Sequence, residues 1–160
     1  MTRATAHKRL WERVAGEDDL RDIATATSLA LAGTSPFCLW LVGPVGAGKT
    51  TLSGSLLHAM GLPEKVPVLS PTYTYLQEYT LPDGRRVAHL DLYRGTALEA
   101  LEDAGVFADL INYSGVLIEW PPMDGASISA AEMGFAPSHI MVITPVESGA
   151  KRHYQLAVAG

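Results

Sequence analysis

The segment Gly43–Thr50, with the sequence Gly-Pro-Val-Gly-Ala-Gly-Lys-Thr, constrains this chain more than any other. It fits the pattern G-x-x-x-x-G-K-[ST], which is typical of the phosphate-binding loop of NTPases. Glycine lets backbone N–H groups close around phosphate oxygens, because no Cβ intervenes. We expect the lysine to reach the outer phosphates and the threonine hydroxyl to ligate Mg²⁺. The nucleotide contacts predicted in this segment are Gly43, Gly46, Ala47, Gly48, Lys49, Thr50 and Thr51.

The residues on both sides of this loop favour the same interpretation. Residues 37–42, Phe-Cys-Leu-Trp-Leu-Val, form a short apolar run that is typical of a buried strand. Residues 51–60 place apolar side chains at positions 52, 56, 57 and 60, as one face of a helix does, and Gly61 ends it. A strand, a glycine loop and a helix N-terminus together make an anion site, because the helix end carries partial positive charge.

The rest of the chain alternates between helical and extended segments. A helix is predicted from Asp18 to Gly33, and Thr96 with Glu99 forms a capping box for another helix. The other predicted elements are strands at 72–79 and 86–91, helices at 97–104 and 106–113, and strands at 115–118, 140–144 and 153–158. In the first part of the chain the predicted helices and strands alternate, whereas in the last part strands follow one another and are expected to pair. The sequence therefore predicts an α/β fold, a P-loop NTPase-like mixed β-sheet flanked by helices.

Length and composition indicate one compact domain. The chain has 160 residues, of which 48% are hydrophobic, and this lies in the ordinary single-domain range. Residues 1–16 are polar and mildly basic, and we expect them to form a flexible N-terminal extension. Residues 17–160 are expected to form a single P-loop ATPase domain. The lone Cys38 lies in an apolar run and is predicted to be a small core residue.

Charge and hydropathy argue against two classes of partner. The net charge is −5, whereas a protein that grips nucleic acid by itself usually has a basic face. The basic pairs Arg85-Arg86 and Lys151-Arg152 are interpreted as solvated turn residues. No run of about 18 apolar residues and no signal-peptide core are found, so no membrane is expected and the cytoplasm is the expected location.

Two carboxylates are candidates for the metal side of the site. Glu119 follows the apolar run 116–118, which matches a strand with an acid at its carboxyl end. Asp91 ends another extended run, with His89 on the same face two residues earlier. We expect Thr50 and Glu119 to bind Mg²⁺, and Asp91 to orient the attacking water or support the metal's water shell. A histidine such as His89 is by itself more often a packed core residue.

Four motifs, taken together, give a resemblance to a known family. In chain order they are Gly43–Thr51, Ser70-Pro71-Thr72-Tyr73-Thr74, His89-Leu90-Asp91-Leu92-Tyr93-Arg94 and Glu119-Trp120-Pro121. In this order and spacing the chain resembles the TsaE family, also known as YjeE, over roughly residues 17–122. The chain departs from the family at Pro44-Val45, where the usual residues are Asp-Leu, so the Asp role is absent here.

The resemblance implies an ATPase of the tRNA threonylcarbamoyladenosine pathway that works with the proteins TsaB and TsaD. In that family ATP hydrolysis resets the TsaB–TsaD transferase complex, and tRNA is contacted indirectly through the complex. An ATPase that is slow alone and faster with partners follows if a charge-stabilising group is supplied in trans. The catalytic residues implied are Lys49, Asp91 and Glu119. Trp120 is a candidate nucleotide contact that either stacks on adenine or packs as core.

Two further segments allow alternative interpretations. Residues 70–79 are either a nucleotide-sensing switch, with Thr72 and Thr74 following the γ-phosphate, or a rigid hairpin arm. Tyr73, Tyr75 and Tyr79 alternate along one strand, and with Tyr93-Arg94 they form either a partner surface or part of the core. We expect Arg94 at the rim of the partner surface.

Three other functions are weighed against this hypothesis. A GTPase would normally carry an N/T-K-x-D motif, which this sequence lacks. A small-molecule kinase should carry an arginine-rich lid, and residues 123–139 contain neither Arg nor Lys. A nucleotide-gated scaffold would share every motif and differ only in turnover.

Lys49 itself is expected to be an exposed loop side chain that contributes little to the core.

Overall fold

The computed structural model describes residues 7–71, 75–93, 97–121, 136–146 and 149–159. Its centre is a seven-stranded sheet in the order β1-β7-β6-β2-β5-β4-β3. The strands are β1 (Lys8–Ala15), β2 (Phe37–Val42), β3 (Leu76–Thr80), β4 (Arg86–Asp91), β5 (Gly115–Glu119), β6 (His139–Val146) and β7 (Lys151–Val158). The strands β6, β2, β5 and β4 run parallel, whereas β1, β7 and β3 pair antiparallel with their neighbours. The predicted mixed sheet is confirmed.

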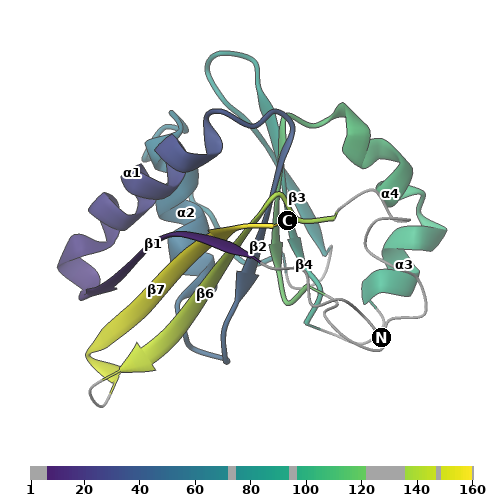
Figure 1. The fold of residues 1–160 in the computed structure, drawn as a ribbon. Coiled ribbons are helices and arrows are strands. Elements are labelled where there is room, and N and C mark those ends of the chain that lie inside the picture. Colours follow the sequence, from purple (N-terminus) through teal and green to yellow (C-terminus); the bar gives the residue numbers. More distant parts are fainter. Residues whose placement is uncertain (1–6, 72–74, 94–96, 122–135, 147–148, 160) are drawn as a thin grey trace.

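Helices cover both faces of this sheet (Figure 1). One face holds α1 (Leu20–Leu31), which follows the short helix η1 (Glu17–Asp19), and α2 (Lys49–Ala59). The other face holds α3 (Ala97–Asp103), α4 (Val106–Asp109) and the short helix η2 (Leu110–Asn112). Among the described residues, no helix has the length and apolar character needed to cross a membrane.

The alternation of side chains along β2 divides the core into two clusters. Phe37, Leu39 and Leu41 pack with residues of α1 and α2, such as Ile23 and Leu52. Cys38 and Trp40, between them, pack on the opposite face with Leu101 and Leu110. Because both faces of β2 are buried, an unbroken apolar run is the sequence that this central strand requires. The strand leading into the loop is therefore held firmly from both sides.

The prediction of a flexible extension is wrong for residues 8–15. These residues form β1, which pairs antiparallel with β7 from Lys8 opposite Val158 to Ala15 opposite Arg152. The physical reason is that the outer edge of β7 needs hydrogen-bonding partners for its backbone. Most side chains of β1 are exposed, so this edge strand lacks the apolar alternation that would have revealed it.

Other expected boundaries shift by a few residues. The strand predicted at 72–79 begins at Leu76, because Tyr75 has φ 60 in the left-handed region and cannot extend the strand. Residues 72–74 and Thr96 of the predicted capping box lie outside the described residues.

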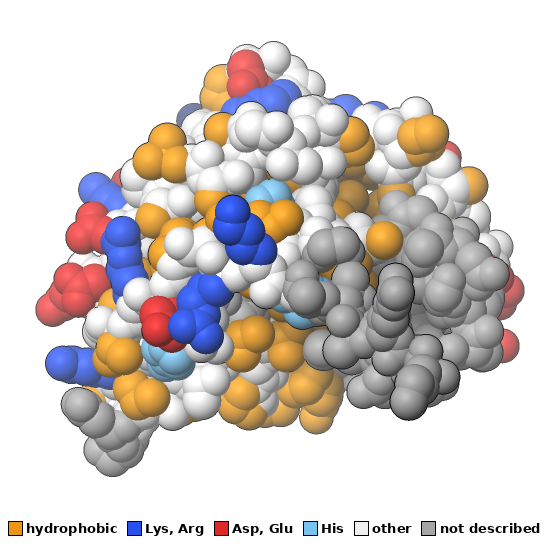
Figure 2. Space-filling view, in the orientation of Figure 1, with side chains coloured by type: hydrophobic (Ala, Val, Ile, Leu, Met, Phe, Trp, Pro, Cys, Tyr) orange, Lys and Arg blue, Asp and Glu red, His pale blue; other side chains and the backbone are white. Residues whose placement is uncertain are grey.

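On the face shown in Figure 2, basic and acidic side chains are interspersed rather than gathered into a basic patch.

Candidate functional site

The loop between β2 and α2 has a backbone that only glycine satisfies at two positions. Gly48 precedes α2 with φ 100, a conformation that costs side-chain-bearing residues energy. A Cβ on Gly43 would lie 2.6 Å from the backbone oxygen of Ile143 in β6, which is too close for any side chain. The sequence G-x-x-x-x-G-K-T is thus explained by steric need, and the loop delivers its backbone to the N-terminus of α2.

Lys49 is the first residue of α2, and its side chain is buried rather than exposed. It is only 5% exposed, so the expectation of an exposed loop side chain is wrong. Its ammonium donates to the carbonyl oxygens of Gly43 at 2.7 Å and Pro44 at 2.9 Å. Burial lowers the pKa of Lys49, while the carboxylates of Glu119 and Asp91 act in the opposite direction. The protein therefore holds a cation directly inside the loop.

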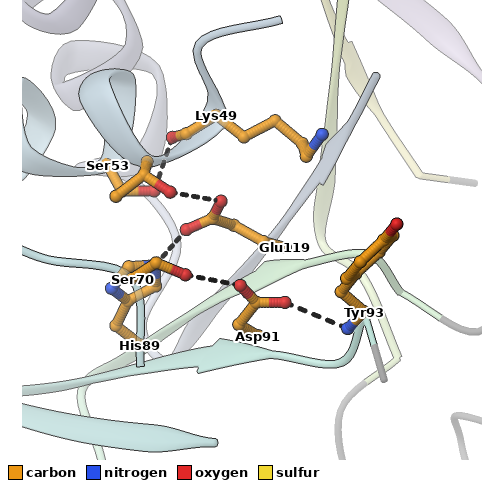
Figure 3. Close-up of polar contacts among 8 residues, drawn as sticks. Lys49, Ser53, Ser70, His89, Asp91, Tyr93 and Glu119 are labelled. Atoms are coloured by element: carbon orange, nitrogen blue, oxygen red, sulfur yellow. Dashed lines mark hydrogen bonds and ion pairs between the residues drawn. The ribbon is translucent and has the colours of Figure 1, made fainter. Parts of the chain in front are cut away.

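Glu119 lies at the carboxyl end of β5 and faces the first turn of α2. Its side chain is buried, and Oε1 accepts a hydrogen bond from the Thr50 hydroxyl at 2.8 Å. Its second oxygen, Oε2, lies 2.5 Å from Nε2 of His89 in β4 (Figure 3). The parallel register aligns Leu41 of β2 with Glu119, so the acid stands beside the strand that carries the loop. Thr50 and Glu119 are brought together as the sequence predicts.

Asp91 lies at the end of β4, directly beside Glu119 in the parallel register. Its Oδ2 accepts a hydrogen bond from the Ser70 hydroxyl at 2.5 Å, and its Oδ1 accepts one from the Tyr93 backbone at 3.0 Å (Figure 3). Two carboxylates therefore stand at the same edge of the sheet, where open α/β folds bind ligands.

A cavity of about 350 Å³ joins these groups, and its lining includes Lys49, Thr50, Asp91, Glu119 and Trp120. The Trp120 ring lies 3.9 Å from the Lys49 ammonium, a cation–π contact. Trp120 is half-buried and has φ 56, a left-handed conformation that is rare for a large side chain. The Trp120 ring belongs to neither core cluster and forms a wall of the cavity beside the lysine.

A second cavity of about 300 Å³ lies on the other side of the loop, lined by Gly46, Ala47, Gly48, Thr51 and Arg152 among others. Arg152 of β7 donates from Nε to the Ala47 carbonyl at 3.0 Å and from Nη2 to the Gly46 carbonyl at 3.3 Å. The C=O and N–H of a trans peptide point in opposite directions, so this contact turns the Gly48 N–H away from Arg152.

Arg152 was not predicted as part of the site. The sequence pair Lys151-Arg152 suggested solvated turn residues, and this is wrong for Arg152 because the sheet brings β7 beside the loop. Nothing local in the sequence distinguishes Arg152 from its neighbour, since the two loop carbonyls that it bonds lie more than a hundred positions earlier. The contact depends on tertiary structure alone.

The oxygen donors of the site fit Mg²⁺. The Thr50 hydroxyl and the carboxylates of Asp91 and Glu119 are hard oxygen ligands of the kind that Mg²⁺ takes. Within the described parts of the chain, no group of three or more His, Cys, Asp or Glu side chains could hold a metal by itself. In NTPase sites, phosphates and water complete the coordination of Mg²⁺.

The tyrosine and threonine hypotheses have mixed outcomes. Tyr79 is 7% exposed and packs in the core, so its predicted place on a partner surface is wrong. Tyr93 is exposed and its ring lies 4.7 Å from that of Trp120, measured between ring centroids. Residues 72–74 and Arg94 lie outside the described residues. Cys38 is confirmed as a core residue, and burial raises the pKa of its thiol to about 12.

Strand β2, the glycine loop that follows it, and the neighbouring strand β5, which ends on Glu119, define a P-loop nucleotide-binding domain. The sequence model of one family, "Threonylcarbamoyl adenosine biosynthesis protein TsaE", matches residues 14–148. This chain belongs to the TsaE family, and the resemblance inferred from its four motifs is confirmed.

Individual relatives agree with this assignment. A tRNA threonylcarbamoyladenosine biosynthesis protein TsaE of Haemophilus influenzae is 42% identical over 83 residues, covering 51% of this chain and 50% of that protein. The protein of the same name from Aquifex aeolicus is 31% identical over 108 residues, covering 68% and 74%. The match therefore spans about half the length of the first relative and about three quarters of the second.

A solved structure shows the same fold. The crystal structure of Bacillus subtilis YdiB superposes with a TM-score of 0.60 at 23% sequence identity. The superposition covers 97% of this chain and 88% of that one. The likeness therefore extends over nearly all of this chain and supports the mixed α/β fold.

Proposed function

We propose that this chain binds ATP with Mg²⁺ and hydrolyses it. The observation that supports this best is the convergence of Lys49, Thr50, Asp91 and Glu119 around one cavity at the loop. These residues come from three different elements, α2, β4 and β5. The fold therefore brings an ammonium, a hydroxyl and two carboxylates to one place. The same set supplies a phosphate cation, a metal-side hydroxyl and two carboxylates, which are the parts that phosphoryl transfer uses.

Each residue has a role that its contacts support. Lys49, now bonded to two loop carbonyls, is placed to neutralise outer phosphate oxygens. Bound Mg²⁺ would supply charge neutralisation at the phosphates. Thr50 and Glu119 would hold it, and their mutual hydrogen bond already aligns them. Asp91, oriented by Ser70, would accept a hydrogen bond from the attacking water and direct it.

The nucleoside would occupy the second cavity, on the Arg152 side of the loop, so adenine would not stack on Trp120, which lines the first cavity. That cavity is continuous with the loop residues Gly46 to Gly48 and is bounded by Ala15, Leu20 and Tyr154 among others. Mixed apolar and backbone surfaces of this kind suit a base and a ribose. Thr51, which also lines the cavity, is placed to contact the nucleotide beside the α-phosphate end of the loop.

We further propose that hydrolysis resets a TsaB–TsaD complex in tRNA threonylcarbamoyladenosine synthesis, in the cytoplasm. Among the described residues that line the phosphate-side cavity, Lys49 is the only cationic side chain. A site with a single cation stabilises transition-state charge poorly, which favours a slow ATPase that gains a group from a partner. The net charge of −5 and the mixed charges in Figure 2 agree with tRNA being held by the partners.

A phosphate-release assay tests this proposal. We would measure turnover of the protein alone, then with TsaB–TsaD, and then with tRNA added, using the Lys49→Ala variant as the blank. We expect slow release alone and a marked increase with the partners. ATP binding without hydrolysis in any mixture would refute the ATPase and favour a nucleotide-gated scaffold.

A further inference from the structure

We propose that His89 is a positioning residue for Glu119, an inference that rests on the proposed Mg²⁺–ATP site. His89 lies in β4, its side chain is fully buried, and its Nε2 lies 2.5 Å from Glu119 Oε2. The other carboxylate oxygen accepts from Thr50. Glu119 is thus held between two donors, one on α2 and one on β4, as Figure 3 shows for the histidine side.

The geometry of β4 explains why a histidine can do this. His89 and Asp91 are two residues apart on one strand, so their side chains share a face of the sheet. In the parallel register His89 stands opposite Leu117 and Asp91 opposite Glu119. The imidazole therefore reaches diagonally to the carboxylate, from a strand that also carries the proposed water-orienting acid.

The other ring nitrogen argues against a purely structural role. Nδ1 of His89 is buried, and within the described residues it has no hydrogen-bond partner. A buried polar atom without a partner lowers stability, and most buried histidines avoid this by bonding both nitrogens. Leucine would fill the same core without that cost. The bond to Glu119 is the feature that the histidine adds, and it acts on the site.

The effect of this bond is to fix the direction of the carboxylate. Thr50 is itself a candidate metal ligand, so its hydroxyl has a second task. His89 has no such task and can hold one oxygen of Glu119 while the other faces the loop. Partners of this kind, one step behind a metal ligand, typically contribute about 10–100-fold to metal affinity or activity.

The test compares two substitutions of His89 with a matched control. His89→Leu removes the donor and keeps an apolar side chain, whereas His89→Gln keeps an N–H near the position of Nε2. His139→Leu is the control, because His139 is also buried in the sheet, in β6, and bonds Ser138 rather than the site. Mn²⁺ affinity is measured by electron paramagnetic resonance with a non-hydrolysable ATP analogue bound. Nucleotide affinity in EDTA and the thermal midpoint are measured in parallel.

We expect His89→Leu to weaken Mn²⁺ binding by about 10–100-fold and His89→Gln to restore it to within a few-fold. Nucleotide affinity in EDTA should not change, and His139→Leu should bind Mn²⁺ as the wild type does. Wild-type Mn²⁺ affinity in His89→Leu would overturn the proposal. Equal losses in the Leu and Gln variants would overturn it too, because packing rather than the hydrogen bond would then be responsible.

A measurement on the unsubstituted histidine covers the case in which His89→Leu does not fold. In metal-free protein the Nε2–H proton of His89 should resonate far downfield, and Glu119→Gln should shift it upfield. No downfield proton, or no change in the variant, would overturn the proposal. If wild-type protein binds neither the ATP analogue nor Mn²⁺ with it, the proposed function fails instead. The proton signal, which needs no nucleotide, separates the two failures.

Discussion

Replacing Glu119 by glutamine gives a sharp test of the proposed site, because the change removes a charge and almost no volume. The amide oxygen can still accept from His89, and the amide N–H can donate to the Thr50 oxygen, so both contacts have replacements. Charged hydrogen bonds contribute about 1 kcal/mol more than neutral ones. Relief from burying a charge offsets part of this loss. The free energy of unfolding should therefore change by only about 1 kcal/mol.

Hydrolysis should respond far more strongly than stability. A carboxylate on a catalytic metal stabilises transition-state charge by several kcal/mol. Losing about 3–4 kcal/mol corresponds to roughly a 10²–10³-fold fall in kcat. Nucleotide affinity in EDTA should stay close to that of the wild type, because Glu119 carries negative charge and contributes no contact to phosphate by itself.

The assay measures phosphate release at saturating Mg²⁺, nucleotide affinity in EDTA, and the thermal midpoint. Glu78→Gln is the matched control, since Glu78 of β3 also accepts from two partners, Arg86 and Tyr113, but lies away from the loop. Hydrolysis at the wild-type rate in Glu119→Gln would refute the assignment. A loss of turnover matched by an equal loss of EDTA affinity would refute it as well, because the defect would then be general.

Three further predictions concern other parts of the site and the core. Lys49→Met should lower nucleotide affinity by about tenfold or more with little change in thermal midpoint, since burial already disfavours the ammonium; retained affinity and turnover would contradict this. Arg152→Met should weaken nucleotide binding about tenfold by freeing the loop carbonyls, whereas Lys151→Met should not, and equal effects in a binding titration would contradict the loop contact. The raised pKa of Cys38 means that the folded protein keeps its thiol proton while the unfolded chain loses it, so stability falls as pH rises from 9.0 towards about 12. Denaturant curves should show a slope of about 1.4 kcal/mol per pH unit that Cys38→Ala lacks, and parallel curves for the two proteins would contradict it.

Local physics explains which parts of the fold could be predicted from sequence. The loop was predictable because steric limits at Gly43 and Gly48 leave a sequence signature. The run from residue 37 to 42 was predictable because both faces of β2 are buried. Most side chains of β1 are exposed, and its backbone pairing with β7 places no demand on them.

The same distinction applies to the site. Asp91 and Glu119 were predictable because acids at the carboxyl ends of adjacent strands must lie near the loop. The contacts of His89 with Glu119 and of Arg152 with the loop could not be predicted, because each joins residues that are far apart in the sequence. Tyr79 was misplaced because an alternating strand has the same pattern whichever face is buried.

The pairing of β1 with β7 has a consequence for how the chain matures on the ribosome. The first described strand must wait for the last, and at about 5–20 residues per second that wait is on the order of ten seconds. During it β1 is an unpaired strand, and its charges at Lys8, Arg9 and Arg13 act against pairing with other chains. Arg152 is synthesised with β7, so until then the loop carbonyl of Ala47 lacks the donor that it has in the folded protein. The nucleotide loop, although encoded in the first third of the chain, is among the last parts to reach its final form.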